Sequence, residues 1–326
     1  MTHFDSNRGG SASASPTGSA PSMGLRMLRT TVDLLDSAVD RLLLLFLLLL
    51  LSLGLYCLYD SSQVYSSADA AQYSAFKPQA EDTLSFAQLR AINPDVVGWL
   101  TVNDTPIDYP VVQGPDNRKY LDTTVEGEYR LSGSLFLDWR NNPAFSDFNS
   151  IIFGHHMEQE RMFGCLSNFG DAAYFDAHPF GGLCLREDWS GGKSGTEGFH
   201  QYGLEFFSVL LTDAYDDVLY SPGVATESRQ AYLDHILNDA LFRREMKVDT
   251  DDHLILLSTC TTERTNGRYV LVGKLTETLH PQTSPPKVNI IGKGVDALTH
   301  FPGILFWFVA VLAIRVTAVL RKRTKR

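Results

Sequence analysis

The sequence predicts a mainly β domain, a barrel or sandwich, between two apolar segments long enough to cross a membrane. In the middle of the chain, short runs of β-branched and aromatic residues alternate with Asn, Asp, Gly and Pro turns. Residues 42–59 form an uncharged apolar run, and residues 301–320 form a second run interrupted only by Arg315. These observations together predict a β domain flanked by two transmembrane helices.

Each apolar run predicts a membrane helix, because even the shorter run, of 18 residues, rises about 27 Å, close to the hydrocarbon thickness of a bilayer. Basic residues lie before the first run and in the tail 321–326 after the second. The positive-inside rule therefore places both ends in the cytoplasm and the central part outside the cell. The alternative for the first run is a cleaved signal peptide, but the small residues Ala68-Asp69-Ala70 lie far downstream of it, which favours an uncleaved anchor.

Changes in composition divide the chain into seven predicted parts. They are a disordered cytoplasmic tail (1–41), a transmembrane helix (42–59), a polar spacer (60–83), the β domain (84–280), a linker (281–300), a second transmembrane helix (301–320) and a basic cytoplasmic tail (321–326).

Charge and cysteine content exclude two classes of protein. The chain carries a net charge of −10, and residues 61–300 hold 18 basic and 33 acidic groups. This segment would repel a phosphate backbone and contains no basic stripe, so the sequence predicts no nucleic-acid binding. Four cysteines are too few for a disulfide scaffold of this size.

Local patterns predict two helices and six strands in the β domain. Apolar residues at near-helical spacing predict a helix over 84–92, which should end before Asn93-Pro94. A second apolar face, formed by Tyr232, Leu233, Ile236, Leu237, Ala240 and Leu241, predicts a helix over about 226–245. The predicted strands are 96–102, 107–112, 134–137, 150–153, 253–259 and 268–275.

Cys260 is a candidate nucleophile. It ends an apolar strand and precedes a polar loop, so its thiol should lie at the mouth of the domain. The alternative is an inert, packed thiol. Arg268 begins the next strand, and a hairpin would place its guanidinium beside the sulfur, where it could favour the thiolate and stabilise an oxyanion.

His155 and His156 are candidates for the proton partner that a nucleophilic cysteine needs. They follow a predicted strand through Gly154, which allows a sharp turn. The alternative is an exposed turn without catalytic role. The sequence contains no Cys-x-x-Cys or His-x-x-x-His spacing, so it predicts no metal site.

Several sequence blocks, taken in order over about 190 residues, resemble the class B sortases. They are FAQLRAINPDVVGWL (86–100), DYPVVQG (108–114) with Asp116-Asn117 and Tyr120-Leu121, GSLFLD (133–138), IIFGHHM (151–157) with Met162-Phe163, and LSTC (257–260) with Arg268.

The resemblance implies a calcium-independent cysteine transpeptidase on an eight-stranded β-barrel, in which the helix at 226–245 is the extra helix of class B. Cys260, His155 and Arg268 match the catalytic positions of the family. Five residues match positions that line its peptide groove: Asn117, Leu121, Phe153, Ser258 and Thr259. Hydrogen bonding at the end of the strand is an equal alternative for the last two.

The resemblance also implies partners and location. The substrates would be surface proteins with a C-terminal sorting signal of the LPxTG or NPxTx type, cleaved after threonine through a thioester. The acceptor would be an amine of the cell-wall precursor at the membrane of a Gram-positive cell. No metal or organic cofactor is implied.

Two departures from class B leave alternatives open. A second membrane span is typical of class C pilin polymerases, which makes a pilin amine an alternative acceptor, yet the Asp-Pro-aromatic lid frequent in class C is absent. Thr262 stands where some class B members carry an acidic residue, so no carboxylate that would orient His155 is evident. A further alternative is a non-enzymatic, membrane-tethered barrel that binds wall peptides.

Overall fold

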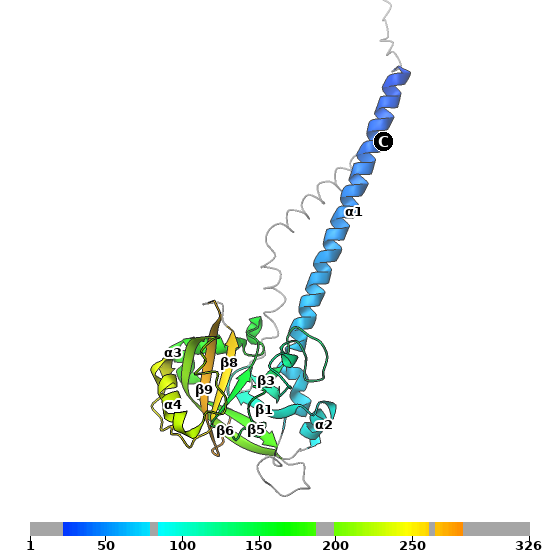
Figure 1. Ribbon diagram of the computed structural model, residues 1–326. Coiled ribbons are helices and arrows are strands. Elements are labelled where there is room, and N and C mark those ends of the chain that lie inside the picture. Colours follow the sequence, from blue (N-terminus) through cyan, green and yellow to red (C-terminus); the bar gives the residue numbers. More distant parts are fainter. Residues whose placement is uncertain (1–21, 79–83, 187–198, 261–264, 283–326) are drawn as a thin grey trace, which may run out of the picture. The chain divides into compact units, whose positions relative to one another are not determined.

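The structure, a computed structural model, describes residues 22–78, 84–186, 199–260 and 265–282. The described residues fall into two units, one ending at Cys57 and the other beginning at Leu58. The elements (Figure 1) are α1 (Met23–Ser67), η1 (Ala70–Phe76), α2 (Leu84–Ile92), β1 (Val96–Val102), β2 (Asp108–Val112), η2 (Lys119–Leu121), β3 (Leu135–Leu137), β4 (Asn149–Phe153), η3 (Glu158–Glu160), η4 (Gly164–Gly170), α3 (Ala172–Ala177), β5 (Phe180–Arg186), β6 (Phe199–Asp213), η6 (Thr226–Ser228), α4 (Arg229–Asn238), β7 (Ala240–Arg243), β8 (Leu254–Cys260) and β9 (Gly267–Thr276).

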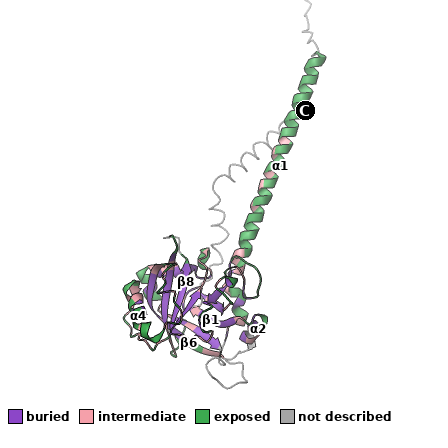
Figure 2. Cartoon of the chain, in the orientation of Figure 1, coloured by how far each residue is buried: buried purple, intermediate pink, exposed green. Residues whose placement is uncertain are grey.

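Among the described residues, α1 is the one helix long and apolar enough to cross a membrane. None of its side chains is buried (Figure 2). The helix extends beyond the predicted span 42–59 in both directions, so the predicted tail 1–41 is helical from Met23 onward. Leu, Met and Arg are good helix formers, and extending an existing helix costs little. The second predicted span, 301–320, lies outside the described residues and stays a prediction.

The second unit is built on a closed barrel of eight strands. The order is β5-β1-β2-β3-β4-β8-β9-β6, and β5 also pairs with β6, which closes the barrel. The β2–β3 and β4–β8 pairs are parallel, and the other pairs are antiparallel. A ninth strand, β7, pairs with β6. The predicted eight-stranded barrel is therefore confirmed.

Strand β8 is buried on both faces, which explains its continuous apolar sequence. Ile255 and Leu257 belong to the larger core cluster, whereas Leu254 and Leu256 belong to a second cluster that includes Ile236 of α4. Because side chains of a strand alternate between its two faces, each pair serves one core. The buried residues lie mainly in the strands of the barrel (Figure 2). The second cluster fixes α4 against the barrel.

Most predicted elements are present. The helix at 84–92 and the six predicted strands occur with ends shifted by no more than one residue. Strands β5 and β6 are not predicted by the sequence analysis. The glycines of β5 and the nearly uniform apolar stretch in β6 obscure the alternation that marks a half-buried strand.

The predicted helix over 226–245 is too long. After the short η6, α4 ends at Asn238, and Ala240 and Leu241 lie in β7 instead of on the helix face. Residues of β6 beyond its pairing with β5 offer free backbone groups, and Ala240 pairs there with Leu210. After α4, the chain therefore pairs with this edge of β6 as strand β7 instead of continuing as a helix.

The segment predicted as a spacer, 60–83, contributes to the packed core. It contains the end of α1 and all of η1. Ala68 and Tyr73 are buried and belong to the larger core cluster. Asp69 caps η1 by accepting a hydrogen bond from the backbone N–H of Ala71 at 3.1 Å.

We predict that Leu257→Ala and Leu241→Ala differ sharply in their effect on stability. Leu257 is fully buried inside the barrel, and its truncation should lower the free energy of unfolding by about 2–5 kcal/mol. Leu241 is 42% exposed, and its truncation should cost no more than about 0.5 kcal/mol. Urea denaturation of the detergent-solubilised chain measures both values. Equal losses would contradict the assignment of residue 241 to an exposed strand position.

Candidate active site

Cys260 is the last residue of β8, and its side chain is exposed although the six preceding residues are buried. In the β8–β9 ladder it lies directly opposite Arg268. Side chains of directly opposite residues in an antiparallel pair lie on the same face, with Cβ atoms about 5 Å apart. The structure thus places the guanidinium-bearing residue beside the thiol-bearing residue.

Gly154 holds the chain that leads to His155 against β8. Its N–H donates to the carbonyl of Ser258 at 3.2 Å, and its own carbonyl accepts from the Thr259 hydroxyl at 2.8 Å. A Cβ at this position would meet the side chain of Leu135 at 2.4 Å and that of Phe163 at 2.7 Å. Only glycine fits between Leu135 and Phe163, and its two hydrogen bonds to β8 bring His155 to the end of the barrel where Cys260 lies.

His155 is fixed by one of its ring nitrogens. Its Nε2 atom lies 2.7 Å from the carbonyl oxygen of Leu121. A carbonyl only accepts hydrogen bonds, so Nε2 carries a proton and donates it. In the neutral imidazole, Nδ1 is then the nitrogen able to take up a proton. A backbone carbonyl therefore occupies the orienting role for which the sequence offered no carboxylate.

One cavity of about 320 Å³ brings the predicted site residues together. All eight of them line it: Cys260, His155, Arg268, Asn117, Leu121, Phe153, Ser258 and Thr259. His156 does not. Its backbone pairs with Met162, and its Nδ1 atom is buried without a hydrogen-bond partner among the described residues.

The cavity also contains a buried carboxylate that the sequence analysis did not select. The side chain of Asp138 is fully buried and accepts from Arg140 Nε at 2.9 Å and from Asn117 Nδ2 at 2.9 Å. Burial raises the pKa of Asp138, but hydrogen bonds from Arg140 and Asn117 outweigh it and hold the pKa below its usual value. The Asn117 Oδ1 atom accepts from the backbone N–H of Trp139 at 3.0 Å. Both ends of the Asn117 amide are thus occupied, which fixes its orientation.

Tyr220 forms another wall of the cavity that sequence reasoning missed. Its hydroxyl lies 2.8 Å from the hydroxyl of Ser258, and its ring stacks on Phe153 at a centroid distance of 6.1 Å. Burial raises the pKa of Tyr220 to about 12, so the group is a neutral phenol near pH 7. Its carbonyl accepts from Arg140 at 3.1 Å. Charged residues directly after a buried strand could have indicated Asp138 and Arg140, but no sequence signal marks Tyr220.

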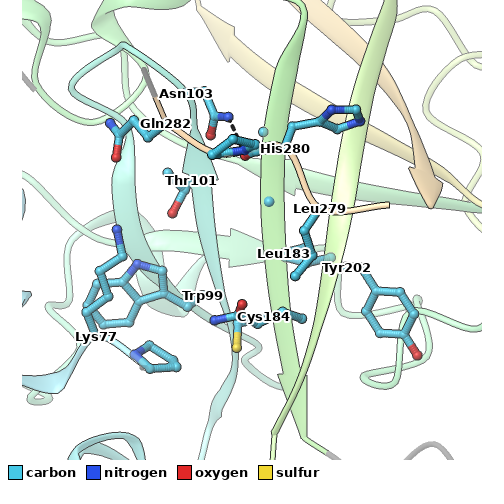
Figure 3. A pocket seen from close by; sticks show the side chains of 15 residues that line it. Lys77, Trp99, Thr101, Asn103, Leu183, Cys184, Tyr202, Leu279, His280 and Gln282 are labelled. Carbon is cyan, nitrogen blue, oxygen red and sulfur yellow. Dashed lines mark hydrogen bonds between the residues drawn. The ribbon is translucent and has the colours of Figure 1, made fainter. Parts of the chain in front are cut away.

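A larger cavity, of about 490 Å³, lies elsewhere on the barrel and is lined by residues of β1, β5, β6 and the segment that follows β9 (Figure 3). It contains Cys184, but burial raises the pKa of that thiol to about 12. The ammonium of Lys77 is paired with Asp108 at 2.8 Å. The Cys184 thiol in the larger cavity is therefore protonated and unreactive near pH 7. The smaller cavity, which contains the exposed Cys260, is the better candidate for the active site.

The remaining cysteines are poor nucleophiles or lie in the apolar helix. Cys165 is fully buried, and burial raises the pKa of its thiol to about 12. Cys57 lies on α1. Among the described residues, no group of three or more His, Cys, Asp or Glu side chains could hold a metal ion.

Comparison with known proteins identifies the family. No family model matches the chain. Sortase B of Listeria monocytogenes is 34% identical over 218 residues, which are 66% of this chain and 82% of the relative. A class B sortase of Streptococcus pyogenes involved in pilus biogenesis is 38% identical, with a TM-score of 0.50 over 58% of this chain and 97% of that structure. A Staphylococcus aureus sortase B–substrate complex is 26% identical, with a TM-score of 0.54 over 69% and 98%.

The closed mixed barrel places an exposed cysteine at a strand end, an opposing arginine and a hydrogen-bonded histidine in one cavity, an arrangement expected of a cysteine-dependent enzyme. The chain belongs to the class B sortases, which are cysteine transpeptidases. Its N-terminal apolar helix is consistent with a membrane anchor.

We predict that a thiol-alkylating reagent separates the cysteines of the barrel. At neutral pH, iodoacetamide should modify Cys260, which is exposed, and should leave Cys165 and Cys184 unmodified because both thiols are buried and protonated. Peptide mapping by mass spectrometry of the folded chain measures each site, and the urea-unfolded chain serves as the control in which all are modified. Preferential modification of Cys184 would assign the nucleophile to the larger cavity.

Proposed function

We propose that this sortase cleaves a sorting signal with Cys260 as nucleophile, Arg268 as oxyanion donor and His155 as general acid and base. The observation that carries the proposal is the shared cavity. It contains an exposed thiol, a guanidinium directly across the ladder and a histidine fixed through Nε2. Membership in the class B family supports the class of reaction.

In the first half-reaction, the Cys260 thiolate attacks the carbonyl carbon of the threonine in the sorting signal. Arg268 donates hydrogen bonds to the oxygen that becomes negative. When the C–N bond breaks, protonated His155 gives a proton to the departing amine. The threonine carbonyl is then held on sulfur as a thioester.

In the second half-reaction, an acceptor amine attacks the thioester. His155, now neutral, takes a proton from the amine, and the C–S bond breaks to release the thiolate. The products are a new amide bond and the starting form of the enzyme. Because Nε2 is committed to the Leu121 carbonyl, Nδ1 is the nitrogen that exchanges protons in both steps.

The substrate we propose is a sorting signal of the LPxTG or NPxTx type. The side chains of Leu121, Phe136 and Phe153 give the cavity apolar walls suited to leucine and proline. Asn117, Ser258 and Thr259 supply polar groups in the same cavity. The similar S. aureus structure is a sortase B–substrate complex, which supports binding of a substrate by a barrel of this kind.

The acceptor we propose is an amine of the cell-wall precursor. A pilin lysine is a second candidate, because the similar S. pyogenes class B sortase is involved in pilus biogenesis. A second membrane span at 301–320, as in class C pilin polymerases, would agree with that candidate. Purified chain incubated with a sorting peptide and either a wall-precursor amine or a pilin domain distinguishes the two by the product formed.

For location, we propose that α1 anchors the protein in the membrane and that the barrel faces the outside of the cell. The apolar helix and the basic residues that precede its apolar run support this orientation. With a second span at 301–320, both ends of the chain would lie in the cytoplasm. A membrane-held barrel would meet both secreted substrates and lipid-linked acceptors at the same surface.

We predict that incubation with a threonine-containing sorting peptide produces a covalent acyl adduct on Cys260. Intact-mass measurement should show an increase equal to the N-terminal cleavage fragment, and hydroxylamine should remove it because thioesters react with this amine. Cys260→Ala should abolish both adduct and transfer, whereas Cys165→Ala should leave both intact. An adduct that persists in Cys260→Ala would disprove the assignment.

We predict unequal roles for the two adjacent histidines. His155→Ala should lower transfer by roughly 10² to 10⁴, the usual contribution of general acid–base catalysis. His156→Ala should cost about tenfold or less, because His156 does not line the cavity. For the wild type, kcat/KM plotted against pH should give a bell-shaped curve. The His155→Ala variant should lose one limb of that curve, and the His156→Ala variant should keep both. Greater damage at His156 would move the acid–base role to that residue.

A further inference from the structure

The loop that follows His155 folds back on the histidine. The carbonyl of His155 accepts from the N–H of Phe163 at 3.0 Å, and His156 pairs with Met162. The backbone position of His155 therefore depends on residues 162 and 163, seven and eight positions further along the chain. We refer to residues 155–163 as the histidine loop.

The histidine loop contains strained backbone. Gln159, Glu160 and Met162 have φ angles of 59°, 58° and 52°, in the left-handed region that residues with a Cβ avoid. Such conformations persist where the surrounding structure holds them, and they cluster at functional sites. The histidine loop therefore needs contacts that hold its backbone in place.

Three of those contacts come from residues 65–69, at and just beyond the C-terminal end of α1. The Tyr65 hydroxyl donates to Glu158 Oε2 at 3.1 Å, and the guanidinium of Arg161 pairs with the carboxylate of Asp69. The third contact is indirect and passes through Tyr109 of β2.

The Tyr109 hydroxyl joins the two segments. It accepts from the N–H of Met162 at 3.1 Å and donates to the carbonyl of Ala68 at 2.8 Å. Burial raises the pKa of Tyr109, so the hydroxyl keeps the proton it needs to donate. One buried group therefore ties a strained residue of the histidine loop to the backbone of residue 68.

The segment 65–69 is itself held firmly to the barrel. Ala68 is fully buried, and the Ser67 hydroxyl lies 2.9 Å from that of Ser132. Both partners of the Arg161–Asp69 pair are largely shielded, with 12% and 27% of their side chains exposed. Solvent therefore screens this ion pair less than a surface pair. A mere tether between membrane and domain would need none of these contacts.

We infer that Tyr65 and Asp69 are positioning residues that hold the histidine loop, so that acyl transfer depends on the C-terminal end of α1 and the residues directly after it. The inference rests on the proposed role of His155. Neither residue lines the cavity. Misplacement of a catalytic group by about 1 Å can lower the reaction rate on the order of 100-fold. Contacts distant from the reacting atoms can therefore control the rate.

The test uses the full-length chain in detergent and measures steady-state transfer from a sorting peptide to an amine. Asp69→Asn keeps the size of the side chain and its capping oxygen but removes the charge that pairs with Arg161. Asp252→Asn is the matched control, because Asp252 forms a similarly shielded ion pair with Lys274 at 2.9 Å. That pair lies at the other end of the β8–β9 ladder from Cys260.

We expect Asp69→Asn to lower kcat about tenfold with little change in KM, and Asp252→Asn to change kcat less than twofold. The same Asp69→Asn change made in the His155→Ala chain should have less than a twofold effect, because the group it positions is gone. Tyr65→Phe, which removes one hydroxyl and leaves the ion pair, should show a smaller loss with the same dependence on His155. This variant keeps the test valid if Asp69→Asn fails to fold.

Two results would overturn the inference. The first is that Asp69→Asn and Tyr65→Phe both have the same kcat as Asp252→Asn. The second is that Asp69→Asn lowers kcat equally in the wild-type and His155→Ala chains, which would show a general effect on the fold. A His155→Ala chain that transfers at the wild-type rate would instead refute the proposed catalytic role of His155. The two failures are therefore distinguishable within one set of measurements.

Discussion

The parallel pairing of β4 with β8 brings two segments that lie about a hundred residues apart in the chain to one edge of the barrel. Phe153 pairs with Ser258 at the end of this ladder, and the next residues on the two strands lead to His155 and Cys260. Closing so long a connection costs chain entropy. Burial of β8 on both faces offsets that cost, because its alternating side chains fill the barrel on one side and support α4 on the other.

The same pairing ties the site to the core. A shift of β8 by one residue would exchange Ile255 and Leu257 with Leu254 and Leu256 between the two cores. It would also turn Cys260 to the opposite face of the sheet. Strand register, which is specified by packing far from the cavity, therefore determines whether the thiol faces Arg268. The alternation of side chains along β8 therefore specifies both the packing of the two cores and the placement of Cys260 beside Arg268.

The positions of residues that end, begin or directly follow a recognisable strand pattern could be predicted from the sequence. Cys260 ends an apolar run, Arg268 begins the next, and Gly154 precedes the histidines, so strand patterns were enough to place them. The hydrogen bond that orients His155 could not be predicted from the sequence, because Leu121 contributes its backbone carbonyl and every residue has one. The end of α4 was also mispredicted, since the free edge of β6 that draws Ala240 into a strand exists only in the folded barrel.

Buried charge in the cavity wall serves orientation more than stability. Asp138 joins Asn117 to Arg140, and Arg140 reaches the carbonyl of Tyr220. Desolvating such a carboxylate is costly, and replacing buried ion pairs by apolar residues often leaves stability unchanged or improves it. What the network provides is a fixed direction for its own polar side chains, Asn117, Asp138 and Arg140, because each already has its partners.

The hydrogen bond from His155 Nε2 to the Leu121 carbonyl has a consequence for the order of events in catalysis. With one ring nitrogen occupied, the imidazole cannot turn to serve two different positions. Under the proposed mechanism, the amine that leaves and the amine that arrives must both meet the same nitrogen, and so must occupy the same place at different times. The cleaved tail of the substrate then has to depart before the acceptor can enter. The acyl-enzyme must wait with its thioester exposed to water in between, and its lifetime against hydrolysis sets how scarce an acceptor the enzyme can tolerate.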